Sequence, residues 1–438
     1  MLEKLFKLKE HGTTVKTELL AGLTTFLAMA YILAVNPGML GTTGMSVQAV
    51  FLATAISSGI ACIIMGLVAN YPVALAPGMG VNAFFTYTVC LTYGYSWSAA
   101  LSAVFVTGLI FLVISVTGIR RIIINAIPPQ LKLAIGGGIG FFICFIGLVN
   151  AGIIVSDAST LVALGNFRDP VVLLSVFGIL VTLVLLSLNI KAGVFWGLLI
   201  TAITGICLGF MGFEGMPTLP SSIVSINFDF SAVGSAFNGI GELFSKPIWP
   251  IVLFSFLFVD FFDTAGTLMA VANRAGLINE KGELNNVEKA LLSDAIGTVA
   301  GAVLGTSTVT SFVESTSGVE VGGRTGLTAC TTGILFLLSV FLSPLLITVT
   351  NAVTAPALVV VGVLMSAQLG GIDWDDFPIA ASSFMVVTFM ILSYSISNGI
   401  AIGFIIYTVT MYASKRGKEL NWIIYLLDLI FLIYFYLG

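Results

Sequence analysis

Charged residues are scarce in this sequence: they make up 9% of its 438 residues, whereas 58% are hydrophobic. A soluble chain of this length needs far more charge to cover its surface. The stretch Leu19–Ile119 contains no Asp, Glu, Lys, Arg or His. It is long enough for about four spans of roughly 20 residues each. The composition therefore predicts an all-α polytopic membrane protein and excludes an ordinary soluble domain.

Histidine is nearly absent, and the cysteines follow no ligand pattern. His11, the only histidine, precedes the first apolar segment, which excludes a histidine proton relay within the membrane. The five cysteines lie in apolar segments without the spacing of metal ligands. We therefore expect no metal, no cofactor and no disulfide framework.

The apolar segments predict fourteen membrane spans. They are 18–35, 47–70, 74–93, 97–117, 132–154, 170–189, 192–211, 248–271, 287–304, 305–322, 325–343, 354–369, 377–395 and 398–413. With the amino terminus inside, every Lys and Arg except Arg168 and Lys246 faces the cytoplasm, as the positive-inside rule requires. We expect a multi-pass protein of the cell membrane with both termini cytoplasmic.

Three regions flank or connect these spans. Residues 1–17 are charged and lack a signal-peptide cleavage site, so they form a cytoplasmic amino-terminal segment. Residues 216–247 form an extracellular connecting loop. Residues 414–438 contain a last apolar stretch, 420–437, with Asp428 midway. We expect a cytoplasmic or interfacial helix there, with a further crossing as the alternative.

The two halves of the chain look related. The matching pairs are VQAVFLATAISSG at 47–59 with VEKALLSDAIGTV at 287–299, and NIKAGVFWG at 189–197 with SISNGIAIG at 395–403. Seven spans per half is an odd number, so the second half is inverted relative to the first. The order of the matches predicts two inverted seven-span repeats, 18–215 and 248–413. Chance similarity between apolar helices is the alternative.

The third segment of each half cannot be an ordinary transmembrane helix. PVALAPGMGVNAFF at 72–85 has prolines and glycines that prevent a continuous helix before about Gly80. GTSTVTSFVESTSG at 305–318 is rich in Ser and Thr and suits an extended segment. Extended backbone at membrane depth must be buried in protein or line a cavity. We expect a half-helix after each break, with Asn82 near the start of one and Glu314 near the start of the other.

The apolar stretch FLFVDFFDTAGTLMA at 256–270 contains two carboxylates. Asp260 and Asp263 lie one helical turn apart, and Thr264 and Thr267 continue the same face. An intramembrane acid on a polar stripe is by default a functional-site candidate that faces an internal cavity. We expect the eighth span to bring these acids to the place where the half-helices meet.

Each candidate also has a structural interpretation. Glu314 follows Ser311 in an S-x-x-E capping box. The Asn82 amide could satisfy backbone groups freed by the break, and Asp263 could be a hydrogen-bonded partner of its neighbour. Asp294, in the ninth span, is a further acid that could join a proton path.

At these residues the chain resembles a known family. APGMGVNAFF (76–85), FVDFFDTAGTL (258–268) and TSTVTSFVESTSGVEVGGRTGLTA (306–329) are similar to the signature segments of AzgA-like purine permeases, which belong to the nucleobase–cation symporters. NPGML after the first span and INAIPPQLKLAIGGGIGFF at 124–142 extend the resemblance over essentially the whole chain.

The resemblance implies both a fold and a function. Spans 1–4 and 8–11 would form a core domain that holds the substrate, and spans 5–7 and 12–14 a gate domain that often pairs two copies of the chain. The family imports guanine, hypoxanthine or adenine with protons. Its binding residues carry over to Asn82, Asp260 and Glu314, and Asp263 would tune Asp260. Protons would then travel on these carboxylates.

The chemistry of a purine fits these residues. A carboxylate can accept two parallel N–H bonds from the purine edge, and an amide can donate and accept. Phe84, Phe261 or Phe312 could pack on the ring face. An anion exchanger of similar fold is disfavoured by the acids. The other rivals are an ion channel and a membrane enzyme that holds Mg²⁺ on D-x-x-D, for whose diphosphate substrate the site lacks basic residues.

Overall fold

The protein is mostly helical. The structure, a computed structural model, describes residues 2–117, 127–220, 222–277, 287–347 and 350–437. Nine helices within these ranges are long and apolar enough to cross a membrane, which confirms the predicted helical membrane protein. Arg120, Arg121 and Lys281, which entered the predicted charge asymmetry, lie outside the described residues.

The elements follow the predicted segments in order. Those of the first half are α1 (Leu2–Phe6), α2 (Val15–Met29), α3 (Ile32–Gly41), α4 (Val47–Ile64), η1 (Met65–Ala69), β1 (Leu75–Pro77), α5 (Met79–Ala83), η2 (Phe84–Thr92), α6 (Trp97–Thr117), α8 (Pro129–Asn150), β2 (Ile154–Asp157), β3 (Leu161–Leu164), α9 (Pro170–Ser187) and α10 (Gly193–Phe210). The connecting loop contains α11 (Ser235–Asn238) and α12 (Ile240–Ser245).

The second half begins with the longest helix of the described chain. Its elements are α13 (Trp249–Ala275), α14 (Val287–Leu304), β4 (Val309–Ser311), α15 (Ser315–Val321), α16 (Gly326–Ser339), η3 (Val340–Leu342), α17 (Ser343–Ile347), α18 (Asn351–Ser366), η4 (Ala367–Gly371), α19 (Phe377–Leu392), α20 (Ile396–Ala413), η5 (Gly417–Glu419) and α21 (Trp422–Leu437). The η labels mark 3-10 and π turns, of which η2 is the longest.

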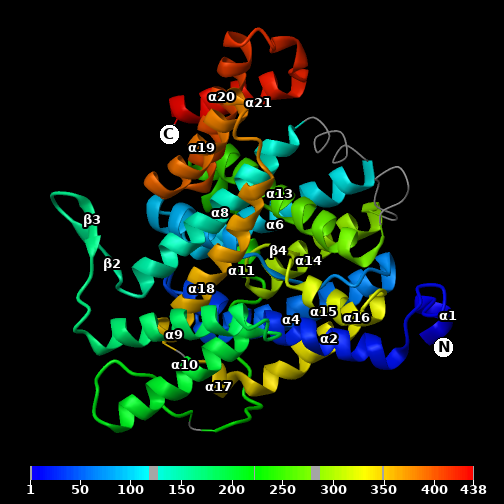
Figure 1. The fold of residues 1–438 in the computed structure, drawn as a ribbon, viewed down its shortest axis with the longest axis vertical. Helices are drawn as coiled ribbons and strands as arrows, with labels where there is room; N and C mark the ends of the chain where they lie inside the picture. The colour runs from blue at the N-terminus through cyan, green and yellow to red at the C-terminus, as the bar shows by residue number, and fades with distance from the viewer. Residues whose placement is uncertain (1, 118–126, 221, 278–286, 348–349, 438) are drawn as a thin grey trace.

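Helices from distant parts of the chain pack in two groups. In one group α16 lies beside α2 and α4, α14 lies beside α6 and α4, and α13 contacts α6 and α15. In Figure 1 this group brings the blue start of the chain next to its yellow part. In the other group α8 packs on α18 and α19, α9 and α10 pack on α18, and α19 packs on α20.

Contacts in one half have counterparts in the other. The α4–α16 contact corresponds to α14–α6 when the halves are exchanged, and α9–α18 corresponds to α19–α8. The glycines matched in the sequence behave alike: a side chain at Gly193 or Gly197 of α10 would collide with α9, and one at Gly399 or Gly403 of α20 would collide with α19. The matches therefore lie at equivalent helix contacts.

The first span differs from its predicted bounds. Instead of one helix over 18–35, α2 ends at Met29, a turn follows at Ala30 and Tyr31, and α3 runs on to Gly41. Pro37 lies inside α3, where it leaves the i−4 carbonyl without its usual helical donor. The predicted span stops at residue 35, before Pro37, whereas α3 continues beyond the proline and packs against α4.

Two glycines allow the closest contact between η1 and α16. A side-chain carbon at Gly66 would overlap the carbonyl oxygen of Gly326, and one at Gly326 would overlap that of Gly66. Small residues at such contacts let helix backbones approach closely, which stabilises helix pairs in membranes.

We therefore predict that Gly66→Ala destabilises the protein by about 1–3 kcal/mol, the usual cost of overpacking. The measurement is the thermal unfolding midpoint of the purified protein in detergent. Gly241→Ala in α12 is the matched control, because no atom lies within 4 Å of the added carbon. Equal midpoints for the two variants would contradict the packing argument.

Candidate functional site

The two interrupted segments meet and pair with each other. β1 runs antiparallel to β4, with Leu75 opposite Ser311 and Pro77 opposite Val309. Each strand is followed by a short helix, α5 after β1 and α15 after β4. The predicted pattern of an extended stretch followed by a half-helix is therefore present in both halves of the chain.

Gly78 allows α13 to come close to the paired strands β1 and β4. A side-chain carbon at Gly78 would lie 2.6 Å from Thr310 Oγ1 and 3.2 Å from Asp263 Oδ2. The Thr310 hydroxyl of β4 donates to Asp263 Oδ2 at 3.4 Å. The second acid of the D-x-x-D pair therefore lies against β4, where the two strands pair.

Glu314 lies at the start of α15, the short helix that follows β4. The Tyr31 hydroxyl, from the turn between α2 and α3, donates to Glu314 Oε1 at 2.6 Å. Glu314 occupies the N-cap position of α15 but makes no side-chain cap bond. The capping-box interpretation is therefore wrong, and the carboxylate faces Tyr31 instead.

Asp260 is fully buried and lies near a fourth acid, Asp294. The Thr264 hydroxyl is 3.4 Å from Asp260 Oδ1 and 2.9 Å from Asp294 Oδ1. Asp294 belongs to α14 and is also fully buried. The structure thus joins Asp260 to the acid of the ninth span through one hydroxyl.

Asn82 is buried in α5 and contacts the tenth segment. Its Oδ1 accepts a hydrogen bond from the Ser307 hydroxyl. Its Nδ2 makes long contacts alone, 3.5 Å to the carbonyl oxygen of Pro77 and 4.0 Å to the sulfur of Met79. Asn82 therefore braces the break, as the structural interpretation expects, and retains donor capacity for a ligand.

The predicted aromatic residues are all buried near these elements. Phe84 lies edge-on against Phe256 with ring centroids 4.9 Å apart. Phe261 and Phe312 are also buried. A stacking role for these rings on a ligand stays a prediction.

Two polar residues in this region were not predicted. Tyr31 interrupts the aliphatic run LAMAYILAV, which is the signal that could have marked it. Asn36 donates to the Thr54 and Thr306 hydroxyls at 2.7 and 2.8 Å, which ties α3 and α4 to the tenth segment. Its position one residue before Pro37 gives no sign of a buried hydrogen bond.

The site can bind a polar ligand through acceptors and hydroxyl groups. Carboxylates dominate it, and between Lys246 and Arg274 the sequence has no basic residue. No group of three or more His, Cys, Asp or Glu in the described part of the chain has the arrangement of a metal site. The arrangement suits a ligand with N–H donors and protonation of the carboxylates themselves.

Comparisons with known proteins agree along the whole chain. The chain is 50% identical to the guanine/hypoxanthine permease PbuG of Bacillus subtilis, over 99% of both chains. It is 42% identical to the adenine permease AdeP of Escherichia coli, over 99% of this chain and 95% of AdeP. Both similarities confirm the resemblance to purine permeases that the sequence motifs suggested.

Among solved structures, the fold is similar to the transmembrane domain of the cyanobacterial bicarbonate transporter BicA. The TM-score is 0.63 at 16% identity, over 88% of this chain and 96% of that one. At this identity the likeness concerns the fold alone. A profile of the Permease family (Xan_ur_permease) matches residues 16–402, and the chain therefore belongs to this family.

Proposed function

We propose that this protein is a secondary active transporter that imports purine nucleobases together with protons by alternating access. Relatives that match nearly its full length are named as guanine/hypoxanthine and adenine permeases. Since the relative at 50% identity is a guanine/hypoxanthine permease, guanine and hypoxanthine are the first substrates to test, followed by adenine.

The observation that carries this proposal is that several carboxylates lie close to the paired strands β1 and β4. Asp263 accepts from Thr310 of β4, Glu314 begins the helix that follows β4, and Asp260 lies one helical turn from Asp263. A purine edge offers N–H donors that such carboxylates can accept, in pairs and at little geometric cost. We assign purine binding to Asp260 and Glu314, helped by Asn82.

The contacts of Thr264 support proton coupling. A hydroxyl group has one hydrogen and can donate to only one of the two carboxyls beside it. The contact of the Thr264 hydroxyl with the other carboxyl is favourable when that carboxyl carries a proton and donates it to the hydroxyl oxygen. Asp260 and Asp294 can therefore share a proton across Thr264, and we add Asp294 to the proposed proton path with Asp260, Glu314 and Asp263.

The packing of the helices supports alternating access. We propose fourteen spans in two inverted repeats, with the α2–α6 and α13–α16 group as the core and the α8–α10 and α18–α20 group as the gate. The paired contacts of the two halves favour this arrangement. Movement of one group against the other would expose the site to each side of the cell membrane in turn. Pairing of two copies through the gate remains an expectation of the family resemblance.

Two other functions share parts of this pattern. The fold likeness to a bicarbonate transporter would suit an anion exchanger, but the buried acids at the site repel anions. An ion channel would conduct continuously through rings of carbonyls or charges. Saturable uptake of labelled hypoxanthine without channel current separates a carrier from both.

The first test concerns Asn82. Asn82→Ala should weaken binding of hypoxanthine by about 1–3 kcal/mol, because a polar group of the bound ligand loses its partner. The measurement is the dissociation constant of the purified protein. Ser307→Ala is the matched control, since it removes the same Ser307–Asn82 bond and leaves the amide in place.

If Ser307→Ala weakens binding as much as Asn82→Ala does, the amide serves only to brace the break. Unchanged affinity of Asn82→Ala for every purine would have the same meaning.

The second test concerns Tyr31, which donates to Glu314. Tyr31→Phe keeps the ring and removes the donor that orients the Glu314 carboxylate, so purine affinity should fall, by at most the roughly 1.5–3 kcal/mol that a hydrogen bond to a charged group contributes. Tyr95→Phe is the control, because it also removes a buried hydroxyl, one that bonds the Leu243 carbonyl in the connecting loop. Equal effects of both variants would mean that Tyr31 acts only on stability.

The third test concerns coupling. Asp260→Asn and Glu314→Gln keep the size of each side chain but cannot titrate, so both should abolish accumulation driven by an inward proton gradient. Removal of a buried charge should not prevent insertion or folding. Asp263→Asn should be milder and alter the pH dependence of uptake, because Asp263 is assigned to tuning.

The measurement is initial uptake of labelled hypoxanthine into vesicles with and without an imposed pH gradient. If Asp260→Asn still accumulates the purine against its gradient with normal pH dependence, Asp260 is not the coupling group. The two acids of α13 would then be structural.

A further inference from the structure

The last helix, α21, presents apolar side chains on both of its sides. Ile423, Ile424, Leu427 and Phe431 are buried against the rest of the protein. The opposite side is exposed and equally apolar, and it includes Leu426, Leu429, Leu432 and Ile433. A helix that lies in the membrane interface needs a polar face, usually with Lys or Arg. α21 has no such face, because its one charged residue is Asp428.

α21 runs antiparallel along α20. The Tyr425 and Tyr412 hydroxyls are 2.9 Å apart, the Thr408 hydroxyl donates to Asp428 Oδ2 at 2.5 Å, and the rings of Phe431 and Phe404 are 5.7 Å apart. In these three pairs the residue number rises along α21 and falls along α20, as it does between antiparallel helices. The two helices therefore form a hairpin, and Figure 1 shows them together at one end of the molecule.

Charged residues outside the spans hold the corner of this hairpin. Arg416 donates to both carboxylate oxygens of Asp376 at 2.7 and 2.9 Å and to Glu419 at 3.0 Å. These hydrogen bonds raise the pKa of the Arg416 guanidinium, and the bond from Arg416 lowers the pKa of Glu419. The corner is thus tied to the start of α19, and its basic residues place it in the cytoplasm by the positive-inside rule.

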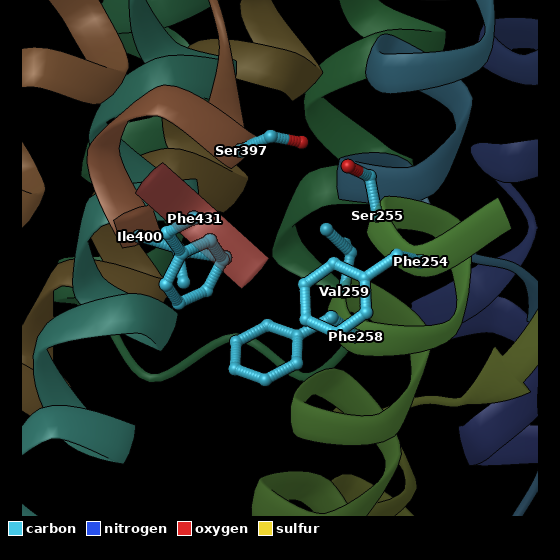
Figure 2. Close-up of a pocket in the computed structure, with 7 residues that line it drawn as sticks. All are labelled: Phe254, Ser255, Phe258, Val259, Ser397, Ile400 and Phe431. Carbon is cyan, nitrogen blue, oxygen red and sulfur yellow. The ribbon is translucent and has the colours of Figure 1, made fainter. Parts of the chain in front are cut away.

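Phe431 of α21 reaches across to α13. Its ring lies 5.6 Å from that of Phe254 and 6.0 Å from that of Phe258. A small cavity separates α13 from α20 at this level, and its lining includes Ser255 and Val259 of α13, Ser397 and Ile400 of α20, and Phe431 (Figure 2). In the same view the two serine hydroxyls point toward each other across the gap, and Phe431 lies next to Ile400.

We propose that α21 is a fifteenth membrane helix, added to the fourteen spans of the two repeats, that stays on α20 and closes its seam with α13, so that the carboxyl terminus lies outside the cell. With 16 residues, α21 is about 24 Å long, most of the thickness of a hydrocarbon core of roughly 30 Å. Lipid chains would cover its exposed apolar side. This replaces the expected cytoplasmic or interfacial helix at 414–438 and the cytoplasmic carboxyl terminus.

The seam closed by α21 lies between the two groups of helices. α13 carries Asp260 and Asp263, whereas α20 belongs to the group that contains α8 and α19. Under the proposed transport function, on which this step rests, these groups move against each other. Phe431 would then keep the two groups in contact while they move, and it would keep lipid out of the cavity.

A topological experiment tests the placement of α21 without reference to transport. A reporter that is active only outside the cell is attached to the full chain after Gly438 and, in a second protein, inserted after Lys418. We expect activity from the first and silence from the second. Silence from both would overturn the proposal, and so would activity at Lys418.

A transport experiment tests the role of Phe431. Phe431→Ala should lower the maximal rate of hypoxanthine uptake by about tenfold, with the half-saturating concentration changed by less than about twofold. Leu432→Ala is the matched control, because this neighbour is 55% exposed on the lipid side and should behave like the wild type. If Phe431→Ala does not accumulate in the membrane, Phe431→Leu, which keeps an apolar side chain without the ring, takes its place.

Equal maximal rates of hypoxanthine uptake for the Phe431 variant and the Leu432 variant would overturn the proposed role of Phe431 at this contact. Absence of purine uptake by the wild type would instead contradict the proposed function, and the reporter result would still decide the position of α21.

Discussion

Backbone groups within a membrane need hydrogen-bond partners, and this requirement decides where the site forms. The two extended segments meet it by pairing with each other. Beyond the β1–β4 ladder, the Gly78 amide donates to the Thr308 carbonyl and the Phe312 amide donates to the Ala74 carbonyl, each at 3.0 Å. Neither segment can stay extended at this depth alone. The site therefore exists only where the two halves of the chain meet.

A buried acid is not by itself a sign of function, as Glu18 shows. Its carboxylate accepts hydrogen bonds from the backbone amides of Arg324 and Thr328, so it caps the start of α16. Glu314 accepts instead from the Tyr31 hydroxyl. A hydroxyl can rotate toward a ligand, whereas a helix amide is fixed. Glu18 also accepts from the Thr328 hydroxyl, but the helix amides still fix its carboxylate, whereas the Glu314 carboxylate can exchange the Tyr31 hydroxyl for a ligand.

The sequence predicts the features that depend on local chemistry. Proline, glycine and hydroxyl residues mark both interrupted segments, and charge in an apolar helix marks Asp260. The partners of these residues depend on tertiary contacts that no spacing reveals, such as Tyr31 beside Glu314. α3 continues past Pro37 because burial outweighs one lost hydrogen bond. The sequence of an apolar segment such as 420–437 is compatible both with a membrane-spanning helix and with an interfacial helix. The two can be told apart only once the side that Asp428 faces is known.

The carboxyl-terminal helix breaks the symmetry between the two halves. The α2–α10 contact of the first half and the α13–α20 contact of the second occupy equivalent places, but only the second is covered by α21. α21 is hydrogen-bonded to α20 through Asp428, whereas Phe431 contacts α13 through its aromatic ring. Rings packed edge-on keep apolar contact without fixed donors. The ring contacts with α13 can therefore re-form after α13 has shifted along α21, while the hydrogen bond keeps α21 on α20. A contact between two groups of helices that move against each other needs this property.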